Sequence, residues 1–147
     1  MHYLVRGIVY GVAFAVVEAM FRALCDNDEH GKLVFAPNWR HGHSTWAMLP
    51  GSMLGGLYFL EPCYFYCRPF ADPAWNLALR LALWPVVIWA IELVWGAFLY
   101  YGCNGTRAWH YQGATARCNG FIKLSYYPYW LILGIAVEAW LYWLSEL

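Results

Sequence analysis

The sequence predicts an all-α integral membrane protein whose four transmembrane helices form two parallel helix–loop–helix repeats. Its composition carries the first part of this prediction: of 147 residues, 62% are hydrophobic and 20% are aromatic, whereas only 12% are charged. A soluble domain carries about 25% charged residues, and a soluble fold of this length could not bury so much apolar surface. The apolar residues also gather in four long stretches, and the two halves of the chain resemble each other.

The composition excludes two other classes of protein. Disordered chains are poor in aromatic residues and rich in charge, unlike this one. Nine Lys and Arg residues balance nine Asp and Glu residues, so the chain lacks the basic excess that binding to nucleic acid requires. The lipid bilayer is therefore the expected surrounding, and residues 1–147 are expected to form one multi-pass membrane domain.

Each of the four apolar stretches is long enough to cross a hydrocarbon core about 30 Å thick as a helix. The predicted spans are residues 4–25, 46–66, 81–101 and 124–144. The first span contains three charged residues, but Arg22 lies near its end, where a long side chain reaches the interface. A cleaved signal peptide does not fit this stretch, because a short apolar core followed by an Ala-x-Ala site is missing.

The loops give two conflicting indications of topology. Four spans place both termini and the short loop 67–75 on one side, with the polar loops 26–45 and 102–122 on the other. The long-loop side holds six basic residues and the terminal side three, so the positive-inside rule favours termini outside the cytoplasm. Cys103 and Cys118 bracket the third loop, however, and they would form a disulfide only if that loop faced an oxidising compartment.

The two halves of the chain, residues 4–66 and 81–145, repeat each other's spacing. The matching intervals are eight residues from Gly42 to Pro50 and from Gly120 to Pro128, then eleven from Pro50 to Glu61 and ten from Pro128 to Glu138. Each half therefore has the order helix, polar loop, helix. Because each half contains two spans, the repeats are parallel and related by an axis along the membrane normal.

Each predicted span carries one inward carboxylate, and these four are candidate binding residues: Glu18, Glu61, Glu92 and Glu138. A carboxylate at bilayer depth costs at least about 2.5 kcal/mol, so it should face the interior, a partner or a water-filled cavity. At a rise of about 1.5 Å per residue, Glu18 and Glu92 lie toward the long loops, and Glu61 and Glu138 lie toward the termini. This predicts two pairs at different depths within a four-helix bundle.

Small residues near the glutamates indicate which helix faces pack closely. Glu18 shares a face with Gly7 and Gly11, a pattern that lets helices approach each other. Glu92 and Glu138 likewise lie four residues from a glycine. These faces are expected to point into the protein.

Two further residues predict how the glutamates are held. Arg22 follows Glu18 by four residues and would form an ion pair with it along the helix. Pro62 has no amide hydrogen to donate to the preceding turn, so the helix should be distorted near Glu61. The glutamates would either hold the helices together or line a polar cavity.

Aromatic residues and histidines in the long loops are the other candidates. With a pseudo-twofold arrangement, the loops that hold His43 and His110 would lie above the first pair of glutamates. Trp109, His110 and Tyr111 over two carboxylates would suit a metal, proton-relay or headgroup site. The simpler alternative for the histidines is a position at the membrane interface.

Motifs of several known enzymes are missing from the sequence. There is no Gly-x4-Gly-Lys-Ser/Thr loop, so the chain is not itself a P-loop ATPase. Neither a Gly-x-Ser-x-Gly elbow nor a His-Glu-x-x-His helix occurs, and the spans lack the Glu-x-x-His spacing of a ferritin-like dimetal bundle. The sequence therefore predicts no cofactor and no catalytic residue.

Several short motifs, taken in order, resemble one family. They are Glu18, His43-Ser44-Thr45-Trp46, Leu60-Glu61-Pro62, Ile91-Glu92 before Gly96, Trp109-His110-Tyr111 and Asn119-Gly120. Over residues 7–143 the chain resembles the bacterial ABC-transporter permease type IV proteins and the eukaryotic transmembrane protein 229 proteins. The resemblance implies a small polytopic membrane protein and adds Asn119 to the candidate binding residues. The family usually has an acid where this chain has His110, so a cation site built on that acid is not expected here.

The sequence thus favours a permease-like protein, or one that binds a small ligand or ion, with an intramembrane cavity lined by Glu18 and Glu92. The alternative is a structural or accessory subunit of a larger membrane complex, with other membrane subunits as partners. The first interpretation is favoured because four carboxylates in lipid are a costly means of only holding helices together.

Overall fold

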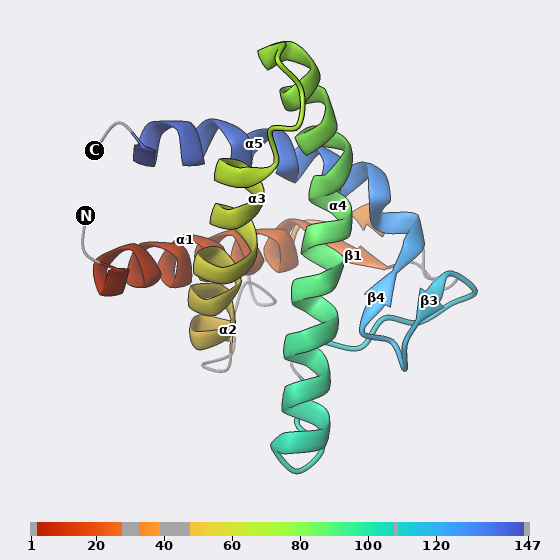
Figure 1. Ribbon diagram of the computed structural model, residues 1–147. Coiled ribbons are helices and arrows are strands. Elements are labelled where there is room, and N and C mark those ends of the chain that lie inside the picture. Colours follow the sequence, from red (N-terminus) through yellow and green to blue (C-terminus); the bar gives the residue numbers. More distant parts are fainter. Residues whose placement is uncertain (1–2, 28–32, 39–47, 108, 146–147) are drawn as a thin grey trace.

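The computed structural model describes residues 3–27, 33–38, 48–107 and 109–145, and most of them are helical (Figure 1). The described residues form four helical segments, one at each predicted span. They are α1 (Tyr3–Leu24), the run α2 (Met48–Gly55), η2 (Gly56–Leu60) and α3 (Glu61–Tyr66), the run α4 (Pro73–Ala97) and η3 (Phe98–Gly102), and the run η4 (Leu124–Tyr126) and α5 (Tyr127–Ser145).

Two of these helices are long and apolar enough to cross a membrane. One is α1, over Tyr3–Leu24, and the other is α4 with η3, over Pro73–Gly102. The helical part of the predicted fold class is confirmed, and long apolar helices are present at two of the predicted spans.

The most extensive helix contacts lie within each half of the chain. In the N-terminal half α1 packs against α2, and in the C-terminal half α4 packs against α5. Figure 1 shows α1 and α5 running across α2–α3 and α4 at a steep angle, instead of along them as in a near-parallel four-helix bundle. The predicted glycine stripe lies in the first of these contacts: Gly7 and Gly11 are buried, and Met53 of α2 lies against both.

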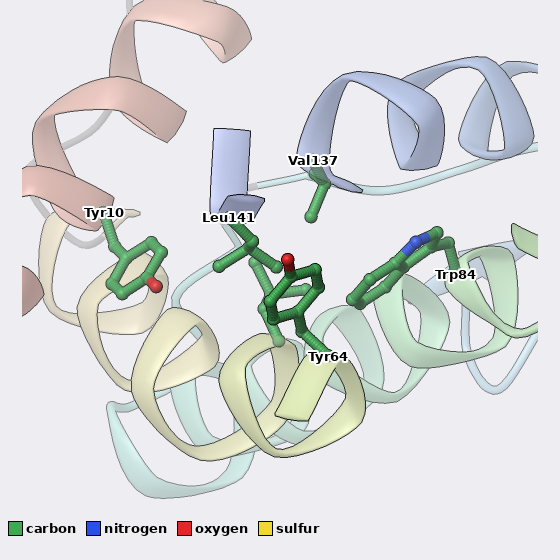
Figure 2. Packing of buried hydrophobic residues seen from close by; sticks show 6 residues of the cluster. Tyr10, Tyr64, Trp84, Val137 and Leu141 are labelled. Atoms are coloured by element: carbon green, nitrogen blue, oxygen red, sulfur yellow. The ribbon is translucent and has the colours of Figure 1, made fainter. Parts of the chain in front are cut away.

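A hydrophobic core joins the two halves where the helices cross. Its buried members are Tyr10, Leu60, Tyr64, Trp84, Val137 and Leu141. Figure 2 shows these side chains gathered between helices of both halves. Trp84 is fully buried. The rings of Tyr10 and Trp140 pack edge to face beside this core, with their centroids 5.2 Å apart.

The short connection between the halves is fixed by capping hydrogen bonds. The side chain of Asp72 accepts a hydrogen bond of 2.8 Å from the amide of Ala74, and Pro73 occupies the first turn, where no amide donor is needed. The side chain of Asn76 accepts from the amide of Phe70 and donates to its carbonyl. The chain therefore turns sharply into α4.

The helix distortion expected near Glu61 takes the form of the π-helical turn η2, which directly precedes that residue. A π turn accommodates one extra residue within a helix. This matches the interval from proline to glutamate, which is eleven residues in the N-terminal half and ten in the C-terminal half. In a regular α-helix, the extra residue would rotate Glu61 by about 100° around the helix axis. The π turn accommodates that residue, and Glu61 is buried.

Both long loops contain a short antiparallel strand pair, which the sequence did not predict. β1 (Cys25–Asn27) pairs with β2 (Leu33–Phe35), and β3 (Ala116–Arg117) pairs with β4 (Ile122–Lys123). The turn between β3 and β4 contains Gly120 at φ +78°, where a Cβ atom would collide with His110. The third loop is therefore folded back on itself next to α4.

Alanine at either of two close-packed glycines should destabilise the fold, although alanine ordinarily favours a helix over glycine by about 0.5–1 kcal/mol. An added Cβ at Gly56 would overlap Tyr10, and one at Gly134 would lie 2.5 Å from Trp84. We expect Gly56→Ala and Gly134→Ala each to lower the free energy of unfolding by about 1–3 kcal/mol. Unfolding of the purified chain in detergent, followed by circular dichroism, measures this.

Gly102→Ala is the matched control for this comparison. Its Cβ would lie 3.4 Å from the Phe98 side chain, which is an ordinary contact. Its stability should equal or slightly exceed that of the parent chain. Equal losses in all three variants would contradict the packing described here.

Candidate functional site

A cavity of about 760 Å³ lies among α1, α2, η2, α4, α5 and the third loop. Both halves of the chain contribute to its wall. The residues that give it polar or hydrogen-bonding character include Glu18, Arg22, Glu92, Trp109, His110 and Tyr111. Five of the predicted binding residues therefore meet at one cavity, although they come from three separate segments of the sequence.

Glu92 is the carboxylate of the cavity with an unsatisfied atom. Its Oε1 accepts a hydrogen bond of 2.5 Å from the hydroxyl of Tyr111. Its Oε2 is buried and has no hydrogen-bond partner among the residues that the structure describes. Burial first, and the adjacent Glu92 carboxylate second, raise the pKa of Tyr111 well above its ordinary value. Tyr111 therefore stays protonated and acts as the donor.

Glu18 forms the predicted ion pair with Arg22 on the same helix, with 2.8 Å between Oε1 and Nη2. Both side chains line the cavity. The guanidinium charge is thus matched within one turn of α1.

The third loop holds its aromatic residues in fixed positions at the cavity. Trp109 Nε1 donates a hydrogen bond of 2.9 Å to the carbonyl of Phe121, and the amide of Tyr111 donates one of 2.9 Å to the carbonyl of Gly120. Gly96 of α4 lets both Trp109 and Phe121 approach the helix closely. The hydroxyl of Tyr111 is thereby placed against Glu92.

The rest of the cavity wall is mainly apolar. Aromatic side chains of α1, η4 and α5 contribute at the loop end, and aliphatic side chains of η2, α4 and α5 contribute farther along the helices. Examples are Phe21, Tyr126, Trp130, Leu60, Ile88 and Leu133. Few, specifically placed polar groups in an apolar wall are typical of small-molecule sites.

The other two predicted glutamates, Glu61 and Glu138, do not line this cavity; each is bound to an arginine of the preceding helical segment. Glu61 accepts hydrogen bonds from Arg6 Nη2 at 2.9 Å and from the Tyr10 hydroxyl at 2.8 Å. Each carboxylate is thus held within the protein, away from this cavity, and its assignment as a binding residue stays a prediction.

Glu138 has the corresponding partners in the C-terminal half. It accepts from Arg80 Nε at 3.0 and 3.2 Å, from Arg80 Nη2, and from Trp84 Nε1 at 3.2 Å. Figure 2 shows Tyr10 and Trp84, the aromatic donors of the two halves, at the same core.

Asn119 and His43 are the remaining candidates, and Asn119 does not line the cavity. Asn119 is exposed, and its carbonyl and side-chain oxygens accept hydrogen bonds from Arg107 at 3.1 and 3.3 Å. Asn119 thus connects two parts of the third loop and is not part of the cavity wall. His43 lies outside the described residues.

The sequence did not lead us to predict Arg6 and Arg80 as partners of Glu61 and Glu138. They were counted only among the three basic residues on the side of the termini. A signal for them was present. Each arginine lies four residues before its aromatic donor and twelve residues before the next glutamate of the same helix, Glu18 or Glu92. This shared spacing would have extended the predicted repeat into the first helix of each half.

The described ranges contain no group of three or more His, Cys, Asp and Glu side chains that could hold a metal ion. Cys103 and Cys118 are free thiols. The topological argument from a disulfide in the third loop therefore has no support in the structure.

Comparison with known protein families, curated proteins and solved structures gives no match to this chain.

Breaking the Arg80–Glu138 pair should destabilise the protein strongly, because one buried charge would then lack its partner. Arg80 is 8% exposed. We expect Arg80→Met or Glu138→Gln alone to lower the free energy of unfolding by about 3 kcal/mol. The double variant should recover most of this loss, since neither charge remains. Unfolding in detergent gives all four corners of the cycle.

Arg117→Met is the control for loss of an exposed guanidinium, which donates to the carbonyls of Ala114 and Ala116. It should change stability by less than about 1 kcal/mol. If the two single losses simply added in the double variant, the ion pair would have no role in the fold.

Proposed function

We propose that this chain is a multi-pass membrane protein, permease-like or ligand-binding, that takes a small molecule or ion into a glutamate-lined cavity within the membrane. The observation that carries the proposal is the convergence of Glu18, Glu92 and Tyr111 on one cavity of about 760 Å³.

Exposed apolar side chains support a membrane location for α1, α4 and α5. Large apolar residues cover the outer faces of α1, α4 and α5: Val12, Val16, Met20, Val86, Val94 and Ile135 are each at least half exposed. Contiguous apolar surface of this extent marks a membrane or a partner rather than water. The two long apolar helices are in keeping with this location.

The equivalent contacts of the two halves support a duplication over residues 4–66 and 81–145. In each half an arginine and an aromatic donor of the first helix bind the glutamate of the second. The aromatic ring also packs on a glycine of that second helix, Gly56 for Tyr10 and Gly134 for Trp84. Two hairpins related in this way would leave a cavity at their junction, as in transporters built from repeats.

The polarity of the cavity supports binding of a ligand there. Its volume lies within the range of about 300–1,000 Å³ that is typical of small-molecule sites. A buried carboxylate oxygen without a donor is costly in an apolar wall, and a bound ligand would remove that cost. Permease-like activity would follow if the cavity opened in turn to each side, and the resemblance to the permease type IV family suggests the same class.

The alternative, a structural or accessory subunit, rests on the ion pairs of Glu61 and Glu138. Both pairs serve helix packing. They account for two of the four glutamates, whereas Glu92 has no such partner within the described part of the chain.

Thiol labelling tests whether the cavity contains water and carries the negative charge of Glu92. In a variant with all five native cysteines replaced by alanine, Ser52→Cys puts a thiol in the cavity wall and Ile135→Cys puts one on an exposed apolar face. A cationic methanethiosulfonate should react about tenfold faster at position 52 than at position 135. At pH 9, adding Glu92→Gln should slow the cationic reagent at position 52 several-fold and leave the anionic ethylsulfonate reagent unslowed, since the local field of the carboxylate would be removed.

Full-length chain in nanodiscs, with labelling followed by mass spectrometry, is suited to this measurement. Asp72→Asn is the matched control, because this acid caps α4 away from the cavity and asparagine caps equally well. If position 52 is as unreactive as position 135, the cavity is dry and the accessory-subunit alternative is favoured.

A further inference from the structure

We infer that the ligand of this cavity is a protonated amine with an apolar body, held through an N–H hydrogen bond to Glu92. The inference rests on the proposed function and deepens it by naming the ligand class. Three features of the cavity argue for it: its charge balance, its one unsatisfied acceptor and the distribution of its apolar wall.

The charge balance favours a cation. The charged and titratable groups that line the cavity are Glu18, Arg22, Cys25, Glu92, His110 and the tyrosines Tyr111, Tyr126 and Tyr129. Arg22 is paired with Glu18 at 2.8 Å, which leaves Glu92 as the acid without a cationic partner among these groups. An anionic ligand would have to displace Glu18 from Arg22 and then face two carboxylates.

The vacant acceptor on Glu92 favours an ammonium group that has an N–H. Tyr111 satisfies Glu92 Oε1, and the buried Oε2 has no donor in the described ranges. A protonated amine supplies both a donor and a countercharge, which makes the strongest kind of hydrogen bond in a protein interior. A quaternary ammonium of the same shape supplies the charge alone.

The apolar wall fits the remainder of such a molecule. The carboxylates lie toward the loop ends of α1 and α4, next to aromatic rings such as Phe21, Trp109 and Trp130. Aromatic faces add cation–π attraction for an ammonium group. Ile88, one turn before Glu92 on α4, and Leu133 continue the wall with aliphatic surface, where an alkyl or aryl body would be buried.

Three probes of one shape test the inference: 4-phenylbutylamine, its trimethylammonium analogue and 4-phenylbutyrate. Binding to the full chain in nanodiscs is measured by calorimetry at pH 9, where an alkylamine is still protonated, with empty nanodiscs subtracted. We expect the amine to bind with a dissociation constant about tenfold below that of the quaternary analogue, the effect of one charge-assisted hydrogen bond. The carboxylate should bind more weakly still.

The variants then assign the selectivity to Glu92. Glu92→Gln should raise the dissociation constant of the amine about tenfold and abolish its advantage over the quaternary analogue. Asp72→Asn should leave all three constants unchanged. The comparison of probes on the unmodified chain needs no variant, so it holds even if Glu92→Gln fails to fold.

Equal binding of the amine and the quaternary analogue would overturn the inference, and so would preference for 4-phenylbutyrate or an amine affinity unaffected by Glu92→Gln. These failures are distinguishable from failure of the proposed function. If the thiol at position 52 reacts as expected while the probes show no amine preference, the cavity binds another class of ligand. If that thiol is unreactive, both proposals fail.

Discussion

The need to neutralise carboxylates in an apolar interior governs this structure. Of the four glutamates carried by the helices, two are bound to arginines across helices of the same half, at 2.9 Å for Arg6–Glu61 and 3.0 Å for Arg80 Nε–Glu138. Each pair links the start of one helix to the second half of the next. Because an unpaired buried charge is so unfavourable, these contacts fix how the two helices of each half cross.

With those two pairs in place, the remaining glutamates occupy a different environment. Glu18 is balanced by Arg22 on its own helix, whereas Glu92 has a tyrosine and one vacant acceptor position in the described part of the chain. A tyrosine stabilises a carboxylate without cancelling its charge. The same type of residue therefore joins two helices in one setting and lines a cavity in the other.

Much of the arrangement was predictable from the sequence, and the features that were not predictable have physical causes. Periodic spacing predicted the i, i+4 pair of Glu18 and Arg22, because a helix brings such residues together whatever surrounds it. It did not predict Arg80 with Glu138, which are 58 residues apart, since no local pattern encodes the crossing of two helices. The steep crossing of the helices was likewise invisible to a hydropathy profile, which reports length and composition but no angle.

The sequence by itself determined the helical class, the apolar surface and one carboxylate in each helix, because these follow from composition and from the length of apolar runs. The tertiary structure alone decided which carboxylates bind arginines of another helix and which line a cavity. It also decided that the π turn before Glu61 absorbs one residue and keeps that side chain buried. The physical reason is that a carboxylate's role depends on the donors that the fold brings within about 3 Å of it, and those donors come from distant segments.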